Sequence, residues 1–204
     1  MGMALAFYIS HPEVVIDPAV PVPQWSLSAI GRARILAVAG VPWVRSMTRI
    51  VSSNETKAIE TAAVLADANG AAVEIRTDMG ENDRSSTGFL PPPEFEATAN
   101  AFFADPAVSI RGWERAIDAQ ARIVRAVTAV LNGHDGTQSI AFSGHGGVGT
   151  LLYCALAGLP IDRRHDQTRG GCVIAIDLAT RQPLFGWVPL ESVSEKLRAV
   201  GLSL

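Results

Sequence analysis

Short apolar runs alternate along this chain with segments that have the features of α-helices. The pattern predicts a first strand ending near Ile9, and later strands over residues 49–52, 72–75, 138–142, 173–177 and 184–188. Helices are expected over residues 26–38, 54–68, 93–103, 113–131 and 147–156. Strands that alternate with helices pair in parallel through right-handed crossovers, and the last two strands, joined by a turn, form a hairpin. The sequence therefore predicts a three-layer α/β/α sandwich with a mostly parallel central sheet.

Residues that begin, end or interrupt helices mark the boundaries of these segments. Ser26 and Asn54 have side chains that cap helix N-termini, and Asn69-Gly70 is typical of a helix end. The four prolines between residues 12 and 24 exclude regular helix from that loop. A second irregular stretch, residues 78–93, ends in three consecutive prolines. Because long irregular loops in compact domains are usually functional or mobile, this stretch is expected to be one or the other.

The composition is that of a single globular domain spanning residues 1–204. Hydrophobic residues make up 48% of the chain and charged residues 18%, which argues against disorder. A net charge of −3 gives no electrostatic basis for binding nucleic acid or an anionic membrane. No apolar stretch approaches the length of a membrane span, and the first apolar run lacks the basic residues of an export signal. Cys154 and Cys172 are expected as buried free thiols in a cytoplasmic protein.

Two of the four histidines follow predicted strands in similar surroundings. His11 ends the segment Ala-Phe-Tyr-Ile-Ser-His, and His145 lies in Ile-Ala-Phe-Ser-Gly-His-Gly-Gly. In both segments an apolar run is followed by a small polar residue or glycine and then by histidine. Ligands of open α/β sheets bind at the carboxyl ends of the strands. The sequence therefore predicts that His11 and His145 belong to one site.

A third segment, Val-Ser-Ser-Asn-Glu-Thr-Lys-Ala-Ile-Glu-Thr-Ala from residue 51, connects the two histidines to a known family. It resembles the signature "Ser-Ser, basic-Ala, x-x-Thr-Ala" of the histidine phosphatase superfamily, which has the phosphoglycerate mutase-like fold. In that family an early strand ends in Arg-His-Gly, and a late strand ends in a second His followed by Gly. Ser10-His11-Pro12 and His145-Gly146 occupy these places here. The resemblance extends from Ala4 to about Pro160.

This resemblance implies a metal-independent phosphomonoesterase without a cofactor, acting on a small phosphorylated molecule. His11 would attack phosphorus to give a phosphohistidine, and His145 with the N–H of Gly146 would stabilise the phosphoryl oxygens. Glu81 follows the third strand where the family carries its acid, and it would protonate the leaving alcohol. Asp83 is close enough in sequence to be the rival acid. A binuclear or zinc site would need tighter histidine and carboxylate spacing.

The chain departs from the family at the positions that bind phosphate. Ser10 stands where the family has arginine, and Lys57 stands at its second arginine, so the site has one cation fewer and loses bidentate geometry. Pro12 replaces glycine and removes a backbone donor. A cation from elsewhere could compensate for this loss. The other arginines considered are Arg45, Arg49 and Arg84.

Two functions of different classes follow from the sequence. The first is a phosphatase working through phospho-His11, with Ser10, Lys57 and Gly146 binding the substrate. The second is a catalytically weak or inactive homologue that binds a phosphorylated ligand or partner. A nucleotide-binding phosphate loop is excluded at residues 144–150 because the lysine it needs is absent, and no Gly-x-Ser-x-Gly elbow supports an esterase. A mutase is less favoured, because beyond residues 78–93 no insertion is long enough to form a lid.

Overall fold

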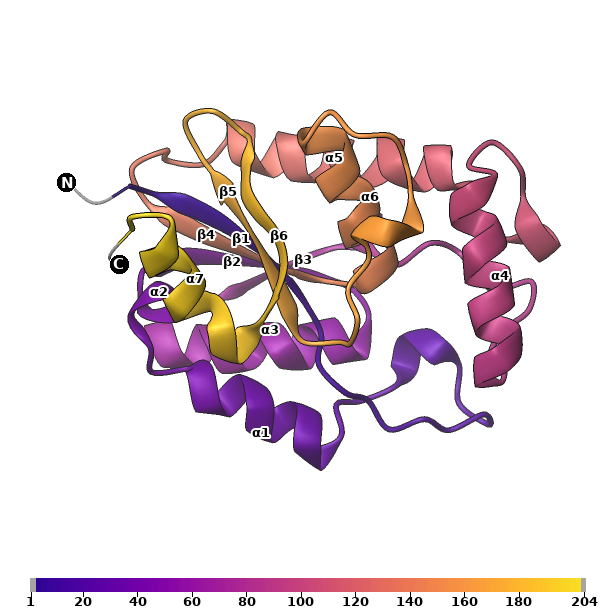
Figure 1. Cartoon of the computed structure of the whole chain (residues 1–204). Coiled ribbons are helices and arrows are strands. Elements are labelled where there is room, and N and C mark those ends of the chain that lie inside the picture. The colour runs from indigo at the N-terminus through magenta and orange to yellow at the C-terminus, as the bar shows by residue number, and fades with distance from the viewer. Residues whose placement is uncertain (1–2, 203–204) are drawn as a thin grey trace.

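A six-stranded sheet forms the centre of the structure, a computed structural model that describes residues 3–202 (Figure 1). The strand order is β3-β2-β4-β1-β5-β6. β1 and β2 both pair in parallel with β4, and β3 pairs in parallel with β2. β5 runs antiparallel to β1 and forms the terminal hairpin with β6. The strands are β1 (Leu5–Ser10), β2 (Met47–Ser53), β3 (Val73–Arg76), β4 (Ser139–Gly144), β5 (Cys172–Asp177) and β6 (Pro183–Pro189).

Helices cover both faces of this sheet, so the predicted α/β/α sandwich is confirmed (Figure 1). Along β1, Leu5, Phe7 and Ile9 pack into one core, while Ala6 and Tyr8 pack into the other, as the two-residue repeat of a strand requires. The first core contains residues of α1 (Ala29–Val38), α2 (Pro42–Arg45), α3 (Thr56–Asn69) and α7 (Val193–Ala199). The second contains residues of α4 (Pro92–Ala104), α5 (Ala116–Asn132) and α6 (Gly146–Leu156).

The structure corrects several expected helix boundaries. Ser28, not Ser26, caps α1, because its Oγ accepts a hydrogen bond from the N–H of Gly31 at 3.1 Å. The residue before α3 is Glu55, not Asn54, and it makes no side-chain cap. α5 begins at Ala116, after a short 3₁₀ turn over Ile110–Gly112, and the predicted 113–131 helix therefore starts too early.

The carboxyl ends of β1, β4 and β2 lie side by side because the three strands are parallel neighbours. Ser10 of β1 pairs with Gly144 of β4, and Ser52 of β2 pairs with Ser143. The residues that follow, His11 and His145, therefore leave the sheet at the same edge. Within residues 3–202, none of the helices has the length and apolar character needed to cross a membrane.

Candidate active site

The structure brings His11 and His145 together at this edge of the sheet. Their ring centroids are 5.4 Å apart, with the planes inclined at 69°. His11 is half-buried and His145 is fully buried. The Nδ1–H of His11 donates a hydrogen bond of 2.9 Å to the carbonyl oxygen of Pro12. This hydrogen bond fixes the tautomer and leaves the lone pair on Nε2 of His11.

Burial lowers the pKa of both histidines. For His11 the pKa falls to about 3, first because of burial and then because His145 lies beside it. For His145 burial also lowers the pKa, and the neighbouring carboxylates of Glu55 and Glu81 offset this only in part. Both imidazoles are therefore neutral near pH 7, which gives His11 a nucleophilic nitrogen and lets His145 act as a neutral hydrogen-bond donor.

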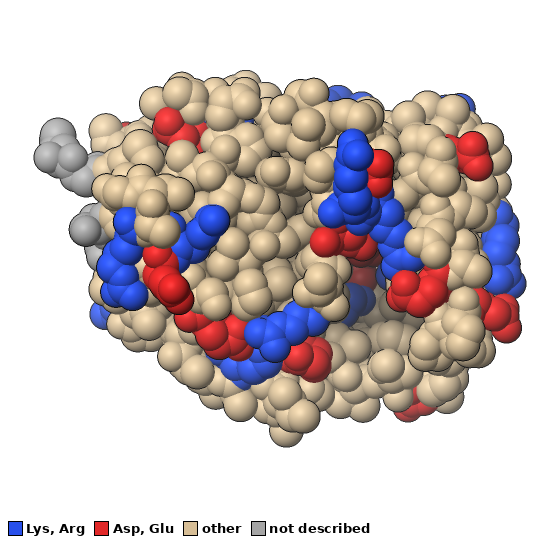
Figure 2. All heavy atoms as spheres, in the orientation of Figure 1, with Lys and Arg blue, Asp and Glu red and all other residues tan. Residues whose placement is uncertain are grey.

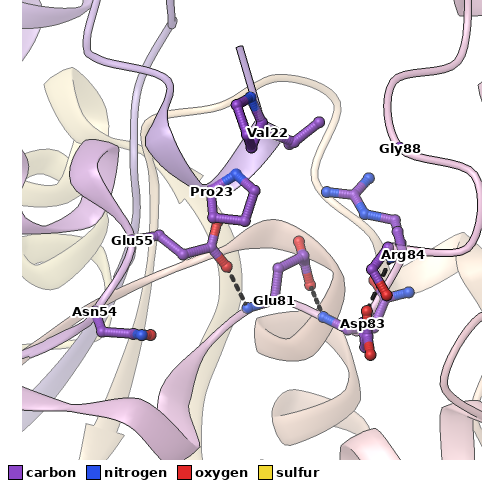
Figure 3. Close-up of a pocket in the computed structure, with 11 residues that line it drawn as sticks. Val22, Pro23, Asn54, Glu55, Glu81, Asp83, Arg84 and Gly88 are labelled. Atoms are coloured by element: carbon purple, nitrogen blue, oxygen red, sulfur yellow. Dashed lines mark hydrogen bonds between the residues drawn. The ribbon is translucent and has the colours of Figure 1, made fainter.

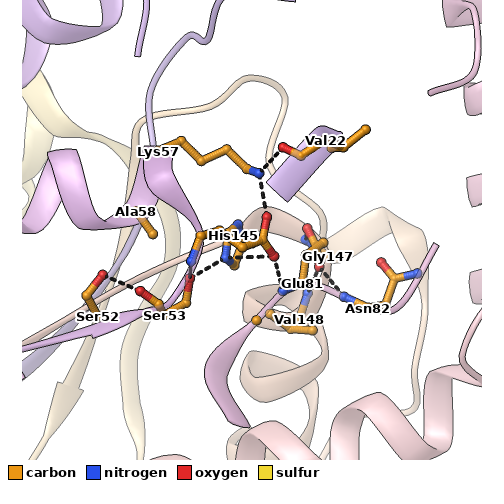
Figure 4. Close-up of polar contacts among 12 residues, drawn as sticks. Val22, Ser52, Ser53, Lys57, Ala58, Glu81, Asn82, His145, Gly147 and Val148 are labelled. Atoms are coloured by element: carbon orange, nitrogen blue, oxygen red, sulfur yellow. Dashed lines mark hydrogen bonds and ion pairs between the residues drawn. The ribbon is translucent and has the colours of Figure 1, made fainter. Parts of the chain in front are cut away.

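His145 is held by side chains from the end of β2 and the residues that join it to α3 (Figure 4). Its Nε2 lies 2.7 Å from Ser53 Oγ and 3.4 Å from Glu55 Oε1. The main-chain N–H of His145 donates to the hydroxyl of Tyr8 at 3.3 Å. Its other ring nitrogen, Nδ1, is buried without a hydrogen-bond partner among residues 3–202. A buried polar atom of this kind needs a partner, and a ligand oxygen could supply it.

Lys57 reaches the site but is paired with a carboxylate (Figure 4). Its ammonium forms an ion pair with Glu55 Oε2 and donates to the carbonyl oxygen of Val22 at 2.8 Å. The Lys57 side chain is 3% exposed and that of Glu55 is 10% exposed. Burial raises the pKa of Glu55, but His145 and Lys57 outweigh it and bring the pKa down to about 2. The charge of Lys57 is therefore largely cancelled within the protein.

Glu81 lies against the first turn of α6. Its Oε2 accepts from the N–H of Gly147 at 3.1 Å, and its Oε1 accepts from the N–H of Val148 at 2.9 Å. Its own N–H donates to Glu55 Oε1 at 2.8 Å. Burial raises the pKa of Glu81, but Arg84, His145 and the bond from Val148 reverse the shift and hold it below the usual range. The carboxyl group is therefore ionised near pH 7 in the free protein.

Arg122 of α5 fixes the main chain on which Glu81 stands. Its guanidinium donates to the carbonyl oxygens of Asp78 (3.1 Å), Gly80 (2.9 Å) and Glu81 (3.1 Å). It also forms a two-bond ion pair with Glu114, at 3.0 and 2.7 Å. Five hydrogen bonds from one rigid fork leave this part of the irregular loop little freedom, so the position of Glu81 depends on Arg122.

Ser10 stands where the family has arginine, and its side chain makes hydrogen bonds to uncharged groups. Ser10 is fully buried, and its hydroxyl donates to Gln167 Oε1 at 2.5 Å and accepts from the N–H of Cys172 at 3.0 Å. The amide of Gln167 packs against Gly146, where a Cβ would lie 2.3 Å from its Nε2. Gly146 thus allows Gln167 to approach the start of α6 closely.

Of the arginines considered as replacements, Arg84 is the one that lines the cleft, together with Glu55 and Glu81 (Figure 3). Its guanidinium stacks over the rings of Phe95 and Trp113, with centroid distances of 5.2 and 5.6 Å. Arg45 is exposed on α2, and Arg49 is bound to Glu74, so neither faces the cleft.

The cleft has a volume of about 470 Å³. In Figure 2 acidic and basic side chains gather around a hollow between the sheet and α4. Asp83, the rival acid, also lines the cleft, but it is exposed and accepts a hydrogen bond from Ser85. Of the two acids, Glu81 alone accepts hydrogen bonds from α6 within the described part of the chain. The lining residues are Pro21, Val22, Pro23, Asn54, Glu55, Glu81, Asn82, Asp83, Arg84, Ser85 and Gly88.

The expected site residues thus converge, with additions that the sequence did not reveal. Glu55, Arg122, Tyr8 and Gln167 were not expected. Glu55 could have been suspected, because a carboxylate two residues before Lys57 at a strand–helix junction falls within the same turn. Among residues 3–202 no three His, Cys, Asp or Glu side chains are grouped so as to hold a metal ion.

The chain is similar in sequence to known proteins. A family model described as histidine phosphatase superfamily (branch 1) matches residues 22–185, beginning after His11. Glucosyl-3-phosphoglycerate phosphatase of Mycolicibacterium vanbaalenii is 30% identical over 146 residues, covering 67% of this chain and 65% of that protein. The chain therefore spans slightly less than two thirds of this curated relative.

Solved structures share the fold. The mycobacterial glucosyl-3-phosphoglycerate phosphatase in complex with inorganic phosphate superposes with a TM-score of 0.75 at 21% identity, covering 92% of this chain and 99% of that chain. Its complex with VO3 gives a TM-score of 0.73 at 21% identity, covering 88% and 96%. At this identity the likeness establishes the architecture only.

Proposed function

The chain belongs to the histidine phosphatase superfamily, and from that premise we propose that it is a metal-independent phosphomonoesterase that acts through a phosphohistidine on His11. The observation that carries the proposal is the pairing of His11 with His145, 5.4 Å apart, beside a half-buried carboxylate, Glu81. The substrate is a small phosphorylated molecule, which agrees with the volume of the cleft. The two buried free thiols support a cytoplasmic location.

His11 is the nucleophile. Because its Nδ1 proton is held by the carbonyl of Pro12, the Nε2 lone pair is available to attack phosphorus. As the Nε2–P bond forms, the P–O bond to the leaving alcohol breaks. Water then attacks the phosphohistidine, releasing phosphate and restoring the neutral imidazole. The low pKa of His11 keeps the nitrogen unprotonated throughout the neutral range.

His145 and Arg84 stabilise the phosphoryl oxygens, together with the N–H of Gly146 at the start of α6, whereas the hydroxyl proton of Ser10 is donated to Gln167 and the charge of Lys57 is balanced by Glu55. The unpartnered Nδ1 of His145 supports this role, since a phosphoryl oxygen would satisfy it. Arg84 supplies the full positive charge that Ser10 does not, because its guanidinium lines the cleft next to Glu81.

Glu81 transfers the proton. A dianionic phosphoryl group beside the carboxylate disfavours its charge and raises its pKa, so Glu81 takes up a proton as substrate binds. It then protonates the leaving alcohol and, once ionised, removes a proton from the attacking water. The contacts of Glu81 with α6 orient it toward the same group as His145.

One observation favours the alternative, in which the chain binds a phosphorylated ligand without efficient turnover. Lys57 is the counterpart of a family arginine, and its charge is cancelled by Glu55. The two functions differ in whether phosphate is transferred to His11.

The test is hydrolysis of p-nitrophenyl phosphate with a chelator present. The wild-type protein and His134→Asn should turn it over at the same rate, because His134 lies after α5 and bonds to Gln138. His11→Asn should abolish turnover. An acid-labile phosphoryl group trapped on His11 supports the enzyme, whereas a wild-type rate equal to that of His11→Asn refutes it.

A further inference from the structure

The charges around the cleft are unusual for a site that takes a phosphate dianion. Three carboxylates line it, those of Glu55, Glu81 and Asp83, and the one guanidinium is that of Arg84. The pKa of each of these carboxyl groups is held below its usual range, so all three are ionised near pH 7. With Lys57 included, the five groups carry a net charge of −1.

Glu55 accounts for the net negative charge of these five groups. Its carboxylate takes up donors that would otherwise serve a bound anion, namely the ammonium of Lys57 and the main-chain N–H of Glu81. It also lies 3.4 Å from Nε2 of His145. Glu55 faces the cleft next to Glu81, the group that serves the leaving alcohol (Figure 3). The excess negative charge therefore falls on the leaving-group side.

Two buried nitrogen atoms without hydrogen-bond partners, next to these carboxylates, point to a ligand that also carries hydrogen-bonding oxygens. Nδ1 of His145 and Nδ2 of Asn82 have no hydrogen-bond partner among residues 3–202, although His145 is fully buried and Asn82 is 6% exposed. Asn82 lines the cleft between Glu81 and Asp83. The ligand that satisfies both observations has oxygen acceptors and a positive charge on one molecule.

We propose that the preferred substrate is a phosphomonoester whose leaving alcohol carries an ammonium group, and that Glu55 sets this preference. The inference rests on the proposed phosphatase function. The phosphoryl group is transferred to Nε2 of His11, the P–O bond breaks, and the alcohol receives its proton from Glu81 while its ammonium remains among the carboxylates. An ammonium reduces the net charge of the ester and is attracted by the same carboxylates that repel an anionic leaving group.

The experiment compares kcat/KM for four esters that differ in the charge of the leaving alcohol. These are phosphocholine and O-phosphoethanolamine, which carry ammonium, glycerol 3-phosphate, which is neutral, and 3-phosphoglycerate, which is anionic. An effective attraction of about 1.4 kcal/mol corresponds to a tenfold preference, so wild type should favour the ammonium esters over glycerol 3-phosphate by about tenfold or more. 3-Phosphoglycerate should be the poorest. High salt should narrow the differences.

Glu55→Gln removes one negative charge and should reduce the ammonium preference by about tenfold, while improving kcat/KM for 3-phosphoglycerate. Glu195→Gln makes the same charge change on exposed α7 and should leave the ratios unaltered. The comparison of kcat/KM among the four esters uses the wild-type protein, so it remains valid even if Glu55→Gln does not fold. Equal kcat/KM for ammonium and neutral esters, or ratios unchanged in Glu55→Gln, overturn the inference. If aryl phosphate is also not hydrolysed, the proposed function itself fails; if it is hydrolysed through His11, only the ammonium preference fails.

Discussion

Replacing Arg122 by methionine should damage catalysis from outside the cleft. Methionine keeps much of the length of the side chain but removes every donor. The change deletes three hydrogen bonds to the carbonyls of Asp78, Gly80 and Glu81, and it leaves Glu114 without its cation. A hydrogen bond to a charged group contributes about 1.5–3 kcal/mol at best, and Arg122 is 22% exposed, so we take about 1 kcal/mol each. The free energy of unfolding should therefore fall by about 3 kcal/mol.

The effect on turnover follows from the same contacts. Without Arg122 the main chain at Glu81 loses its anchors, and a displacement of about 1 Å of a reacting group costs about 100-fold in rate. We expect kcat for p-nitrophenyl phosphate to fall by one to two orders of magnitude, with a smaller change in KM, because Arg122 does not line the cleft. The basic limb of the pH–rate profile should also move, since it reports on the acid.

The matched control is Arg115→Met, at the residue immediately before α5. Arg115 also pairs with a carboxylate, Asp118, at 2.6 Å, but the two side chains are 46% and 48% exposed. Because ion pairs between exposed side chains contribute little to stability, this variant should keep both its free energy of unfolding and its kcat. Urea unfolding and steady-state kinetics measure the two effects. If Arg122→Met loses stability but retains kcat and the pH profile, Arg122 is merely structural and the reasoning is refuted.

Three further predictions concern buried groups. The pKa of His11 is about 3 in the folded protein and about 6.5 in the unfolded chain. Below pH 6.5 the unfolded chain therefore binds more protons at this residue than the folded protein does. As the pH falls from 6.5 towards 3, protonation of His11 in the unfolded chain lowers the free energy of unfolding. Urea unfolding of the wild-type protein should give a lower free energy of unfolding at pH 5 than at pH 7.5, and the difference should be smaller in His11→Asn. An equal difference in the two proteins contradicts the prediction. Ser10→Arg should reduce stability by about 3 kcal/mol or more, because it removes the bond to Gln167 and buries a guanidinium without a carboxylate; unchanged urea unfolding with tighter phosphate binding refutes this. Gly149→Ala places a Cβ 2.6 Å from two aromatic rings and should cost about 1–3 kcal/mol in urea unfolding, unlike Gly136→Ala, which meets nothing within 4 Å; equal values for the two refute the packing argument.

The fold was largely readable from the sequence because local signals and tertiary contacts agree. β1 and β4 are buried throughout and have apolar centres, as strands covered on both faces do, and Gly70 ends α3 in a left-handed conformation (φ 62°). α7 was missed because only Val193 and Leu197 of its seven residues are buried, too few for a periodic pattern. Ser26 has the side chain of a helix cap, but Leu27 forms an antiparallel bridge with Val14, and the helix therefore begins only at Ala29.

The residues expected at the site could be proposed from the sequence because each follows a strand or begins a helix, where the family motif is local. The residues that were missed act over long separations. Arg122 lies 41 residues beyond the carbonyl of Glu81 to which it donates, in the middle of a helix that reads as an ordinary amphipathic one. Gln167 meets Ser10 across 157 residues. No local pattern encodes such contacts, because they depend on how α5 and the loop before β5 pack on the sheet.

The differences from the family pattern alter the charge of the site and leave the proposed reacting groups in place. The histidine pair and Glu81 are held by their own hydrogen bonds, and none of these involves Ser10 or Lys57. At the anion-binding positions, by contrast, a neutral Ser10–Gln167 contact and a Lys57–Glu55 pair leave little net positive charge. A site that had simply lost function would not need a carboxylate buried against its lysine, since burying Glu55 is costly unless it is paired. Because the reacting groups do not depend on these substitutions, the altered charge should change which phosphate esters bind rather than whether phosphoryl transfer occurs.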